Sequence, residues 1–428
     1  MKKSLLAVAA IGAFASAAQA QSSVTVYGIL DVGYVGGNAK ASTVNATGGQ
    51  ITPAENVSLF GQSAQTTSRL GFKGTEDLGG GLSALFTFET GLQPQQTSLS
   101  SFNNRQAFVG LAKKGAGNAR IGTQYTPIHE AVGATGANQQ NNLVGDVIYP
   151  QNTGLTNRDG SASNANAGYT VRSNNMLRFE SESFAGFTGK AFMVQNARNE
   201  NQTSYATNST STATAAYTSG LGYVGGNTNS NGWGLGVNYT WQKLLVSANY
   251  QSFTTENAWN QQTNQVAVGV AGTTPVTRTQ AAQTGILTNM KDNQVYAGAT
   301  YDFGILKAYA QYVNRKETSG LDSNAYAKRS AQQIGVRSFV TPTVEVWASG
   351  GMGRYTAFGY ANPTTDFTGY QLGANYWLSK RTNLYTIFGA TNTSQSSGQV
   401  VLSNGTTSMA RSFSANANNY AVGVRHTF

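Results

Sequence analysis

Charged residues in this chain stand singly, inside stretches where polar and apolar side chains alternate. Arg69 and Lys73, for example, flank the apolar pair Leu70 and Phe72. Side chains on a β-strand point alternately to opposite faces, so the two cations share one face and the apolar pair takes the other. Fixed charges that face water attract small ions of opposite sign and repel ions of like sign. The spacing therefore indicates ion filtering rather than bond-making chemistry.

The same alternation assigns a face to other charged residues. Leu177 and Phe179 take the apolar face of their stretch, which turns Arg178 and Glu180 to the polar face. Arg105 is assigned to a polar face too, although the two faces of its stretch are less distinct. The further residues assigned to a polar face are Lys243, Lys307, Arg337, Arg425, Asp31, Glu89 and Glu345. Taken singly, each of these is more simply interpreted as a solvated side chain.

Other kinds of site have little support. A Ser-His-Asp hydrolase needs a histidine beside a nucleophile and an acid, and only His129 could serve, because His426 falls on an apolar face. The spacing of Gly232, Gly234 and Gly236 superficially resembles a nucleotide-binding loop, but no helix follows it. Residues 157–160 lack the alternating carboxylates of a calcium loop, and the chain has no cysteine for a thiolate metal site. We expect no enzymatic activity, no cofactor and no metal.

The elements that carry these residues are predicted to be membrane-crossing strands. Trp233, Leu235, Val237, Tyr239 and Trp241 alternate with glycine, asparagine and threonine. Aromatic residues at both ends of an apolar face, with aliphatic residues between them, are typical of a strand that crosses a bilayer. One such strand is weak evidence, but the pattern recurs with the same polarity at 244–251, 295–303, 370–378 and 420–428.

Short turns and long polar links alternate between these strands. The predicted short turns lie at 77–81, 114–117, 184–186, 241–243, 302–304, 341–343 and 379–381. The predicted long loops lie at 37–66, 92–102, 124–172, 199–231, 256–290, 317–328, 356–365 and 395–416. Seven turns and eight loops join sixteen strands, and an even number lets the first strand, 22–36, pair with the last and close the barrel. A sixteen-stranded barrel leaves an aqueous channel.

The N-terminal segment is predicted to be a signal peptide. Lys2 and Lys3 precede an apolar stretch that ends in Ala18-Gln19-Ala20, with cleavage expected after Ala20. The alternative, an uncleaved anchor, is disfavoured because the apolar stretch is shorter than the roughly 20 residues of a spanning helix. We therefore divide the chain into a signal peptide, 1–20, and one barrel domain, 21–428. No later apolar run could span a membrane as a helix, so a membrane protein built from this chain must be a closed barrel.

Composition agrees with an exported barrel. Only 11% of residues are charged, against about 25% in a typical soluble protein. The formal net charge is +10, and removal of Lys2 and Lys3 leaves +8. No run of lysine and arginine of the nucleic-acid-binding type occurs, so no nucleic acid partner is expected.

Several segments resemble the trimeric general porins of Gram-negative outer membranes, most closely their β-proteobacterial branch. The segments are 22–28 with Asp31, 68–82 (beginning Ser-Arg-Leu-Gly-Phe-Lys-Gly), 104–111, 378–382 and the terminal Val-Arg-His-Thr-Phe of 424–428. The resemblance covers nearly the whole chain after residue 20. It departs at Gly122-Thr123-Gln124, where the family often has arginine at the middle position.

The resemblance implies a homotrimer of sixteen-stranded barrels, with short periplasmic turns, long extracellular loops and a third loop that bends into the lumen. That loop would span about 124–172. By the same resemblance Arg69, Arg105 and Arg172 form the basic side of a pore constriction, and we expect Asp146, on the loop, to balance them in part. Lys73, Arg178, Arg337, Arg425, Asp31 and Glu89 are expected to line the pore.

These observations predict an outer-membrane porin, a water-filled channel for passive diffusion of small hydrophilic solutes and inorganic ions, with a preference for anions. Its expected partners are two further copies of the chain, outer-membrane lipid and lipopolysaccharide, and the outer-membrane assembly machinery, for which Phe428 resembles the recognition signal. Two alternatives stay open: a solute-selective anion channel, and a barrel enzyme such as a lipase or protease.

Overall fold

A computed structural model describes residues 23–44, 50–52, 54–100, 104–151, 168–206, 221–256, 259–260, 289–320, 326–358, 364–395, 398–401, 407–410 and 414–428. The expected signal peptide, 1–20, and the segment 157–160 lie outside these ranges. Within the described part of the chain, no helix is long and apolar enough to span a membrane.

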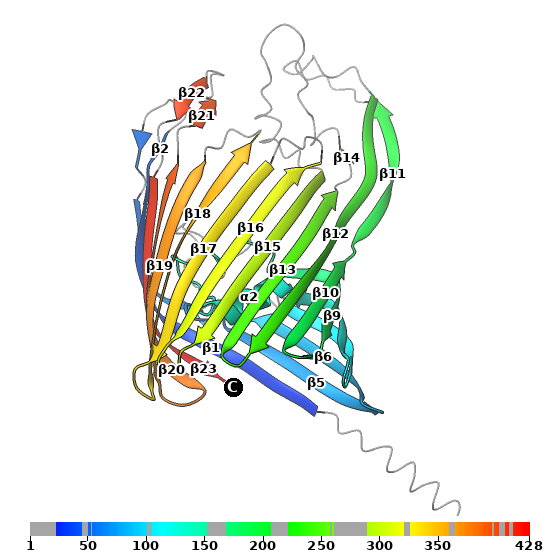
Figure 1. The fold of residues 1–428 in the computed structure, drawn as a ribbon. Helices are drawn as coiled ribbons and strands as arrows, with labels where there is room; N and C mark the ends of the chain where they lie inside the picture. Colours follow the sequence, from blue (N-terminus) through cyan, green and yellow to red (C-terminus); the bar gives the residue numbers. More distant parts are fainter. Residues whose placement is uncertain are drawn as a thin grey trace, which may run out of the picture.

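The architecture is a closed antiparallel β-barrel of sixteen strands, as predicted (Figure 1). The strands of its wall are β1 (Ser23–Ala41), β5 (Arg69–Gly79), β6 (Leu82–Gly91), β7 (Asn104–Lys113), β8 (Gly117–Tyr125), β9 (Arg172–Ser181), β10 (Phe187–Val194), β12 (Leu221–Trp241), β13 (Leu244–Glu256), β15 (Asn289–Asp302), β16 (Lys307–Ser319), β17 (Tyr326–Phe339), β18 (Val344–Phe358), β19 (Thr365–Trp377), β20 (Thr382–Gln395) and β23 (Ser414–Thr427). Each pairs with its neighbours along the chain, so the wall is a simple meander.

Seven shorter strands are also described, three joined to the sheet of the wall and four in two separate two-stranded sheets. They are β2 (Thr43–Val44), β3 (Gln50–Ile51), β4 (Ala54–Gln62), β11 (Ala197–Ala206), β14 (Trp259–Asn260), β21 (Gly398–Val401) and β22 (Thr407–Ala410). β4 pairs with the upper part of β1, and β11 pairs with the upper part of β12. The predicted loop at 199–231 is therefore partly a strand pair, because backbone pairing above the membrane does not need an apolar face.

The first and last strands close the barrel, which confirms the predicted pairing. β1 and β23 are in register from Ile29 opposite Thr427 to Ala41 opposite Ala415, so β1 runs beyond the predicted end at Gly36. Two hydrogen bonds between Gly28 and Phe428, of 3.0 and 3.1 Å, complete the seam. The Phe428 ring covers Gly28 so closely that any β-carbon there would clash with it.

All seven predicted short turns are present, at one end of the barrel (Figure 1). The turn between β5 and β6 shows why its sequence is rich in glycine. Gly79, Gly80 and Gly81 all have positive φ angles, of 85°, 60° and 76°. Such angles are unfavourable for residues with a β-carbon, so this turn requires glycine.

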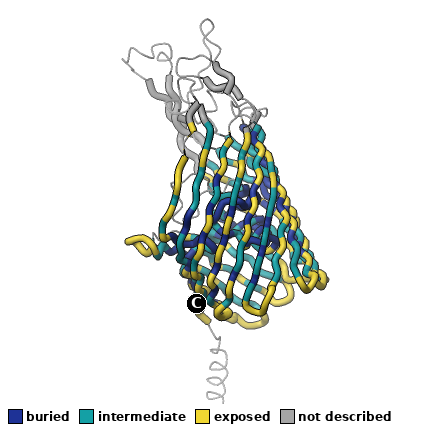
Figure 2. The backbone as a smooth tube through the Cα atoms, turned by 90° about the vertical axis from the view of Figure 1, so that its left-hand side faces the viewer, coloured by how far each residue is buried: buried dark blue, intermediate teal, exposed yellow. Residues whose placement is uncertain are grey.

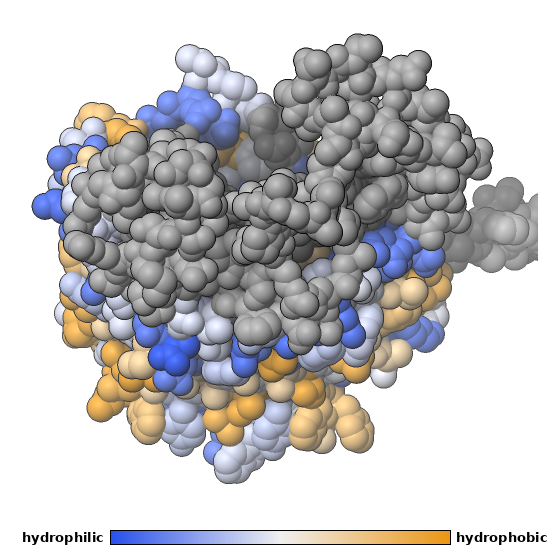
Figure 3. All heavy atoms as spheres, turned by 90° about the horizontal axis from the view of Figure 1, so that it is seen from above, coloured by the Kyte–Doolittle hydropathy of each residue, from blue (hydrophilic) through white to orange (hydrophobic). Residues whose placement is uncertain are grey.

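The two faces of each strand are as the alternation predicts. Trp233, Leu235, Val237 and Trp241 are 50%, 57%, 41% and 56% exposed on the outside of β12. Buried residues instead gather inside the barrel (Figure 2). Hydrophobic residues lie around much of the outer circumference, with hydrophilic residues at the rim (Figure 3). The hydrophobic outer surface is suited to lipid.

We predict that Val237→Arg destabilises the barrel by about 2–4 kcal/mol, because it places a cation on the lipid-facing side near the middle of a strand. Asn238→Arg on the same strand should cost less, since Asn238 points inward and forfeits only one hydrogen bond, from Ser247 at 2.7 Å, worth about 1 kcal/mol. The free energies of unfolding of both variants can be measured by urea unfolding in lipid vesicles. Equal losses would contradict the assigned faces.

Candidate pore constriction

The described parts of the segment between β8 and β9, residues 126–151 and 168–171, lie inside the barrel, which confirms the predicted inward third loop. It begins with helix α2 (Pro127–Thr135), which lies inside the barrel (Figure 1). Thr126 caps the helix by accepting a hydrogen bond from the His129 backbone N–H at 3.3 Å, and Pro127 occupies the first turn, where no N–H is needed. Ile128, Val132, Val147 and Ile148 of the loop form an apolar cluster with Tyr296 and Val313 of the wall.

Five glutamines on the inner wall bind the loop. We call them the wall glutamines: Gln251, Gln294, Gln311, Gln333 and Gln371, on β13, β15, β16, β17 and β19. Gln371 donates to the backbone oxygens of Leu143 and Val144, each at 2.9 Å. Gln333 accepts from the Val147 N–H at 3.1 Å. A loop buried inside a protein must find partners for its backbone groups, and neutral amides supply them here.

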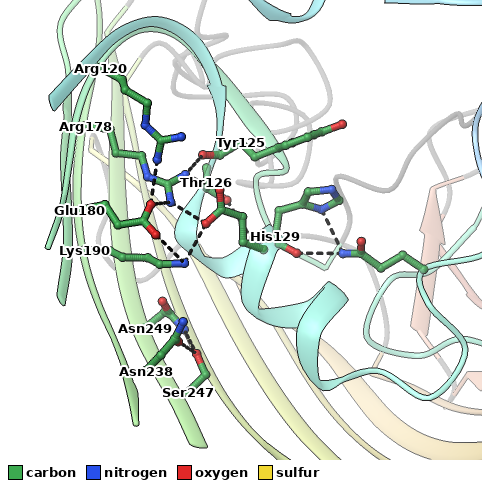
Figure 4. A network of polar contacts seen from close by, with 12 residues as sticks. Arg120, Tyr125, Thr126, His129, Arg178, Glu180, Lys190, Asn238, Ser247 and Asn249 are labelled. Carbon is green, nitrogen blue, oxygen red and sulfur yellow. Dashed lines mark hydrogen bonds and ion pairs between the residues drawn. The ribbon is translucent and has the colours of Figure 1, made fainter. Parts of the chain in front are cut away.

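A group of ion pairs fixes the start of α2 (Figure 4). Glu130, in the first turn, accepts from Arg178 Nη1 at 2.6 Å and from Lys190 Nζ at 2.8 Å. Glu180 bridges Arg178 and Arg120, at 2.9 and 2.8 Å. Burial alone would raise the pKa of Glu130, but the hydrogen bonds and charge of Arg178, with Lys190, lower it to about 2. The carboxylate therefore stays ionised and holds the helix to β9 and β10.

The three arginines expected at the constriction lie around one carboxylate and one tyrosine. Arg105 Nε is 2.7 Å from Glu89 Oε1, and Arg69 Nη1 is 3.8 Å from the same oxygen. Arg105 also donates to the Tyr125 hydroxyl at 2.6 Å. The Arg172 guanidinium lies 5.8 Å from the centre of the Tyr125 ring, and that of Arg105 lies 6.0 Å from it. The arginines come from β5, β7 and the start of β9, where these strands meet the inward loop.

Asp146, expected to balance the arginines in part, forms hydrogen bonds within the loop. Its side chain accepts from the backbone N–H groups of Ile148 and Tyr149, at 2.7 and 2.9 Å, and from Asn138 at 2.7 Å. The residue is only 4% exposed, and burial raises the pKa of its carboxyl group against the effect of these hydrogen bonds. Asp146 organises the loop where the loop packs on the far wall.

Several residues expected to line the pore are covered by protein. Asp31, Glu89 and Arg178 are 0%, 3% and 1% exposed. Asp31 accepts from the Tyr385 hydroxyl at 2.6 Å and from the backbone N–H groups of Gln65 and Thr66. Their inward orientation is as predicted, but the folded loop and neighbouring side chains take the place of water.

Of the other residues expected to line the pore, Lys73 is exposed, and Arg337 and Arg425 are partly buried. Arg337 donates to the Ala137 carbonyl of the loop and lies 3.4 Å from Glu345. The Arg425 guanidinium lies 5.4 Å from the centre of the Trp377 ring, and Lys73 lies at the same distance from Tyr27.

His129 sits in an aromatic cluster rather than in a catalytic group. Its Nδ1 lies 3.2 Å from both the Tyr169 hydroxyl and Gln140 Nε2, and its ring lies 4.5 Å from that of Tyr125. Burial, reinforced by the charges of Arg105 and Arg172, lowers its pKa to about 3, so the ring is neutral at physiological pH. Among the described residues no group of histidine and acidic side chains could hold a metal ion.

A closed sixteen-stranded barrel with a loop folded into its lumen defines the class of membrane channels. The Gram-negative porin family model matches residues 7–282 and 271–396, and the chain belongs to that family. It is 28% identical over 419 residues to an outer membrane porin protein of Bordetella pertussis, covering 90% of this chain and 93% of that one. It is 33% identical over 194 residues to outer membrane porin protein 32 of Delftia acidovorans, covering 44% and 48%.

Solved structures share the fold. The anion-selective porin from Comamonas acidovorans superposes on this structure with a TM-score of 0.60 and is 21% identical in sequence. The superposition covers 95% of this chain and 100% of that chain. The outer membrane protein OmpT of Vibrio cholerae, in a trimer form, gives 0.55 at 15% identity, covering 95% and 99%. The family and the barrel together show a porin of the Gram-negative outer membrane, not an enzyme.

We predict that acidification loosens the inward loop through His129. The folded pKa of about 3 lies below the ordinary 6.5, so the contribution of this group to stability is complete above about pH 6.5 and is lost as the pH falls towards 3. At pH 5 the loss for complete opening is up to about 2 kcal/mol. Hydrogen exchange of 127–135, corrected for intrinsic rates, should show more frequent opening at pH 5 than at pH 7.5.

His129→Gln should remove the loss of protection between pH 7.5 and 5. Glu130 keeps its charge until lower pH, and Asp146, whose pKa burial raises, acts in the opposite direction because its protonation on acidification favours the folded loop. A loop that opens equally at both pH values in the unmodified protein would contradict the assignment.

Proposed function

We propose that this porin prefers anions, and that Arg69, Arg105 and Arg172 set the preference at the narrowest part of the channel. The observation that carries the proposal is the gathering of three guanidinium groups beside a single carboxylate: Arg69 and Arg105 pair with Glu89, and Arg172 lies over the ring of Tyr125, which Arg105 also contacts. Arginine stays protonated at any working pH, so the local charge is a lasting excess of two positive units. In a passage with low-dielectric walls, such an excess concentrates anions and repels cations.

The position of Asp146 strengthens this excess. The carboxylate that was expected to offset the arginines is occupied by hydrogen bonds within the loop. Glu130 and Glu180 are likewise engaged, with Arg178, Lys190 and Arg120. Thr123 acts in the opposite direction. The porins that this chain resembles often have an arginine at this position, whereas this chain has a neutral threonine. The anion preference of this chain should therefore be milder than that of those porins.

A solute-selective anion channel is the second candidate. The guanidinium groups of Arg105 and Arg172 lie 6.0 and 5.8 Å from the centre of the same Tyr125 ring, and two cations so close to one another suit a bound anion as well as a passing one. Saturable block of the current by one organic anion would favour selective binding, whereas a current that rises in proportion to concentration favours diffusion alone. A barrel enzyme is not favoured, because His129 has tyrosine and glutamine partners.

The assembly and export of the chain are also proposals. We infer a homotrimer from the family resemblance and from the trimer form of the related OmpT structure. Residues 1–20 would be removed on export, Phe428 would be recognised by the assembly machinery, and the outer surface would contact outer-membrane lipid. Small hydrophilic solutes and inorganic ions would be the cargo.

Replacing Arg69 and Arg172 together by alanine should shift the zero-current potential of single channels, recorded under a salt gradient, towards cation preference. A charge about 4 Å from an ion is worth about 1 kcal/mol in water, so loss of two should lower the anion-to-cation permeability ratio several-fold. The preference of the unmodified channel should weaken between 0.1 M and 1 M salt, as the Debye length falls from about 10 to about 3 Å.

The matched control is Lys380→Ala with Arg381→Ala, which removes the same charge from an exposed periplasmic turn. It should leave the ratio nearly unchanged. An unmodified channel that prefers cations, or a constriction variant as selective as this control, would rule the mechanism out.

We expect the mature chain to run as a heat-labile trimer on mild detergent gels and to give a β-rich circular dichroism spectrum before heating. A monomer under all mild conditions would contradict the trimer while leaving the channel proposal to the conductance measurements.

A further inference from the structure

Four glycines on the inner wall of the barrel have no room for a side chain, because the inward loop lies directly against them. We call them the seat glycines: Gly298, Gly335, Gly369 and Gly389, on β15, β17, β19 and β20. A β-carbon at Gly335 would lie 2.6 Å from the β-carbon of Ala137 in the loop. One at Gly298 would clash with the side chain of Thr135 in α2. Carbon atoms in ordinary contact are about 3.5–4.0 Å apart, so an alanine at either position would displace the loop.

Each seat glycine adjoins one of the wall glutamines. The two residues of a pair lie either opposite each other on adjacent strands or two positions apart on one strand, so both face the lumen. The pairs are Gly298 with Gln311, Gly335 with Gln333, Gly369 with Gln371, and Gly389 with Gln371. An amide that can bind the loop therefore stands beside a position that leaves space for the loop backbone.

The loop backbone approaches the wall backbone most closely between β19 and β20. Gln371 donates to the carbonyl oxygen of Val144 at 2.9 Å, and a β-carbon at Gly389 would clash with that same oxygen. Gly145, the next residue of the loop, has a φ angle of 105°, which is unfavourable for a residue with a β-carbon. A β-carbon at Gly369 would lie 2.5 Å from the carbonyl oxygen of Gly145. Backbone thus packs on backbone here, and an added methyl group would disturb the hydrogen bond that holds the loop.

The seat glycines and the constriction arginines lie on different parts of the wall. Arg69, Arg105 and Arg172 belong to β5, β7 and β9, whereas the seat glycines belong to β15–β20. Around the barrel, β10, β12 and β13 separate the two groups of strands on one side, and β23 and β1 separate them on the other (Figure 1). A loop that moves off its seat therefore moves into the lumen, towards the arginines.

We propose that the seat glycines set the width of the channel. Because they have no β-carbon, the loop lies deeper against β15–β20 than it could against other residues, and the passage beside the arginines is wider as a result. The glycines carry no charge, so this role is independent of the anion preference proposed above.

Gly369→Ala together with Gly389→Ala tests the proposal by adding two methyl groups beneath the loop. In single-channel recordings this seat variant should conduct about half as well as the unmodified protein, because the passage of ions depends on pore diameter. In liposome swelling assays it should exclude larger sugars that pass the unmodified channel. The sign of its zero-current potential under a salt gradient should not change, since no charge is altered, and this separates the test from that of the arginines.

The matched control is Gly189→Ala together with Gly350→Ala. It adds two methyl groups to strand glycines at which a β-carbon would come no closer than 3.7 Å to other residues. This control should conduct as the unmodified protein does. Equal conductance of the seat variant and the control would overturn the proposal. So would a higher conductance of the seat variant, which would mean that the loop had left the wall altogether.

A transfer of one methyl group from the loop to the wall separates narrowing from faulty folding. Gly335→Ala alone should lower the conductance, and the further change Ala137→Gly, which removes the opposing β-carbon, should restore it. The composition of this double variant is that of the unmodified chain, so a general loss of stability would not be repaired in this way. If Ala137→Gly fails to raise the conductance of the Gly335→Ala variant, the loop does not rest on the seat and the proposal is wrong.

Discussion

The requirement that every backbone N–H and C=O find a partner away from water governs this structure. In a bilayer only a helix or a closed barrel meets that requirement, and the seam between β1 and β23 is what closes this one. The meander, the outward apolar faces and the water-accessible interior all follow from closure. Compared with a soluble protein, the usual distribution of side chains is reversed. Apolar side chains of the strands face outward, and polar side chains of the strands face the interior.

The backbone groups of the inward loop also need hydrogen-bond partners. Having left the wall, its backbone binds the wall glutamines rather than water. Charge is used at only a few points, chiefly where Glu130 fastens the first turn of α2. This division leaves the arginines beside Glu89 in excess, because the two acids in the described part of the loop, Glu130 and Asp146, are already engaged. The same packing that narrows the channel thus determines the sign of its field.

Period-two alternation was sufficient to predict the strands, the turns and the faces of residues such as Arg69 and Val237, because these depend only on neighbours along one strand. It could not predict the contacts of the loop. Glu130 meets Lys190 from 60 positions away, and no local pattern relates them. The Thr126-Pro127 start with an acid in the first turn could have indicated α2 and, with it, a role for Glu130. The partners of Asp146 could not be predicted either, because they depend on how the loop folds, and in the sequence the wall glutamines cannot be told from other polar residues.

The seam has a consequence for the way the barrel comes into being. Gly28 and Phe428 bond across the full length of the barrel sequence, so this contact cannot form until all intervening strands are in order. Pairings so distant in sequence are intrinsically slow. Until then a growing sheet carries two open edges, each a template for pairing with the wrong chain. Nascent barrels of this kind are therefore at greatest risk of aggregation just before the final strand docks, and the rate of that last step sets how long they need protection.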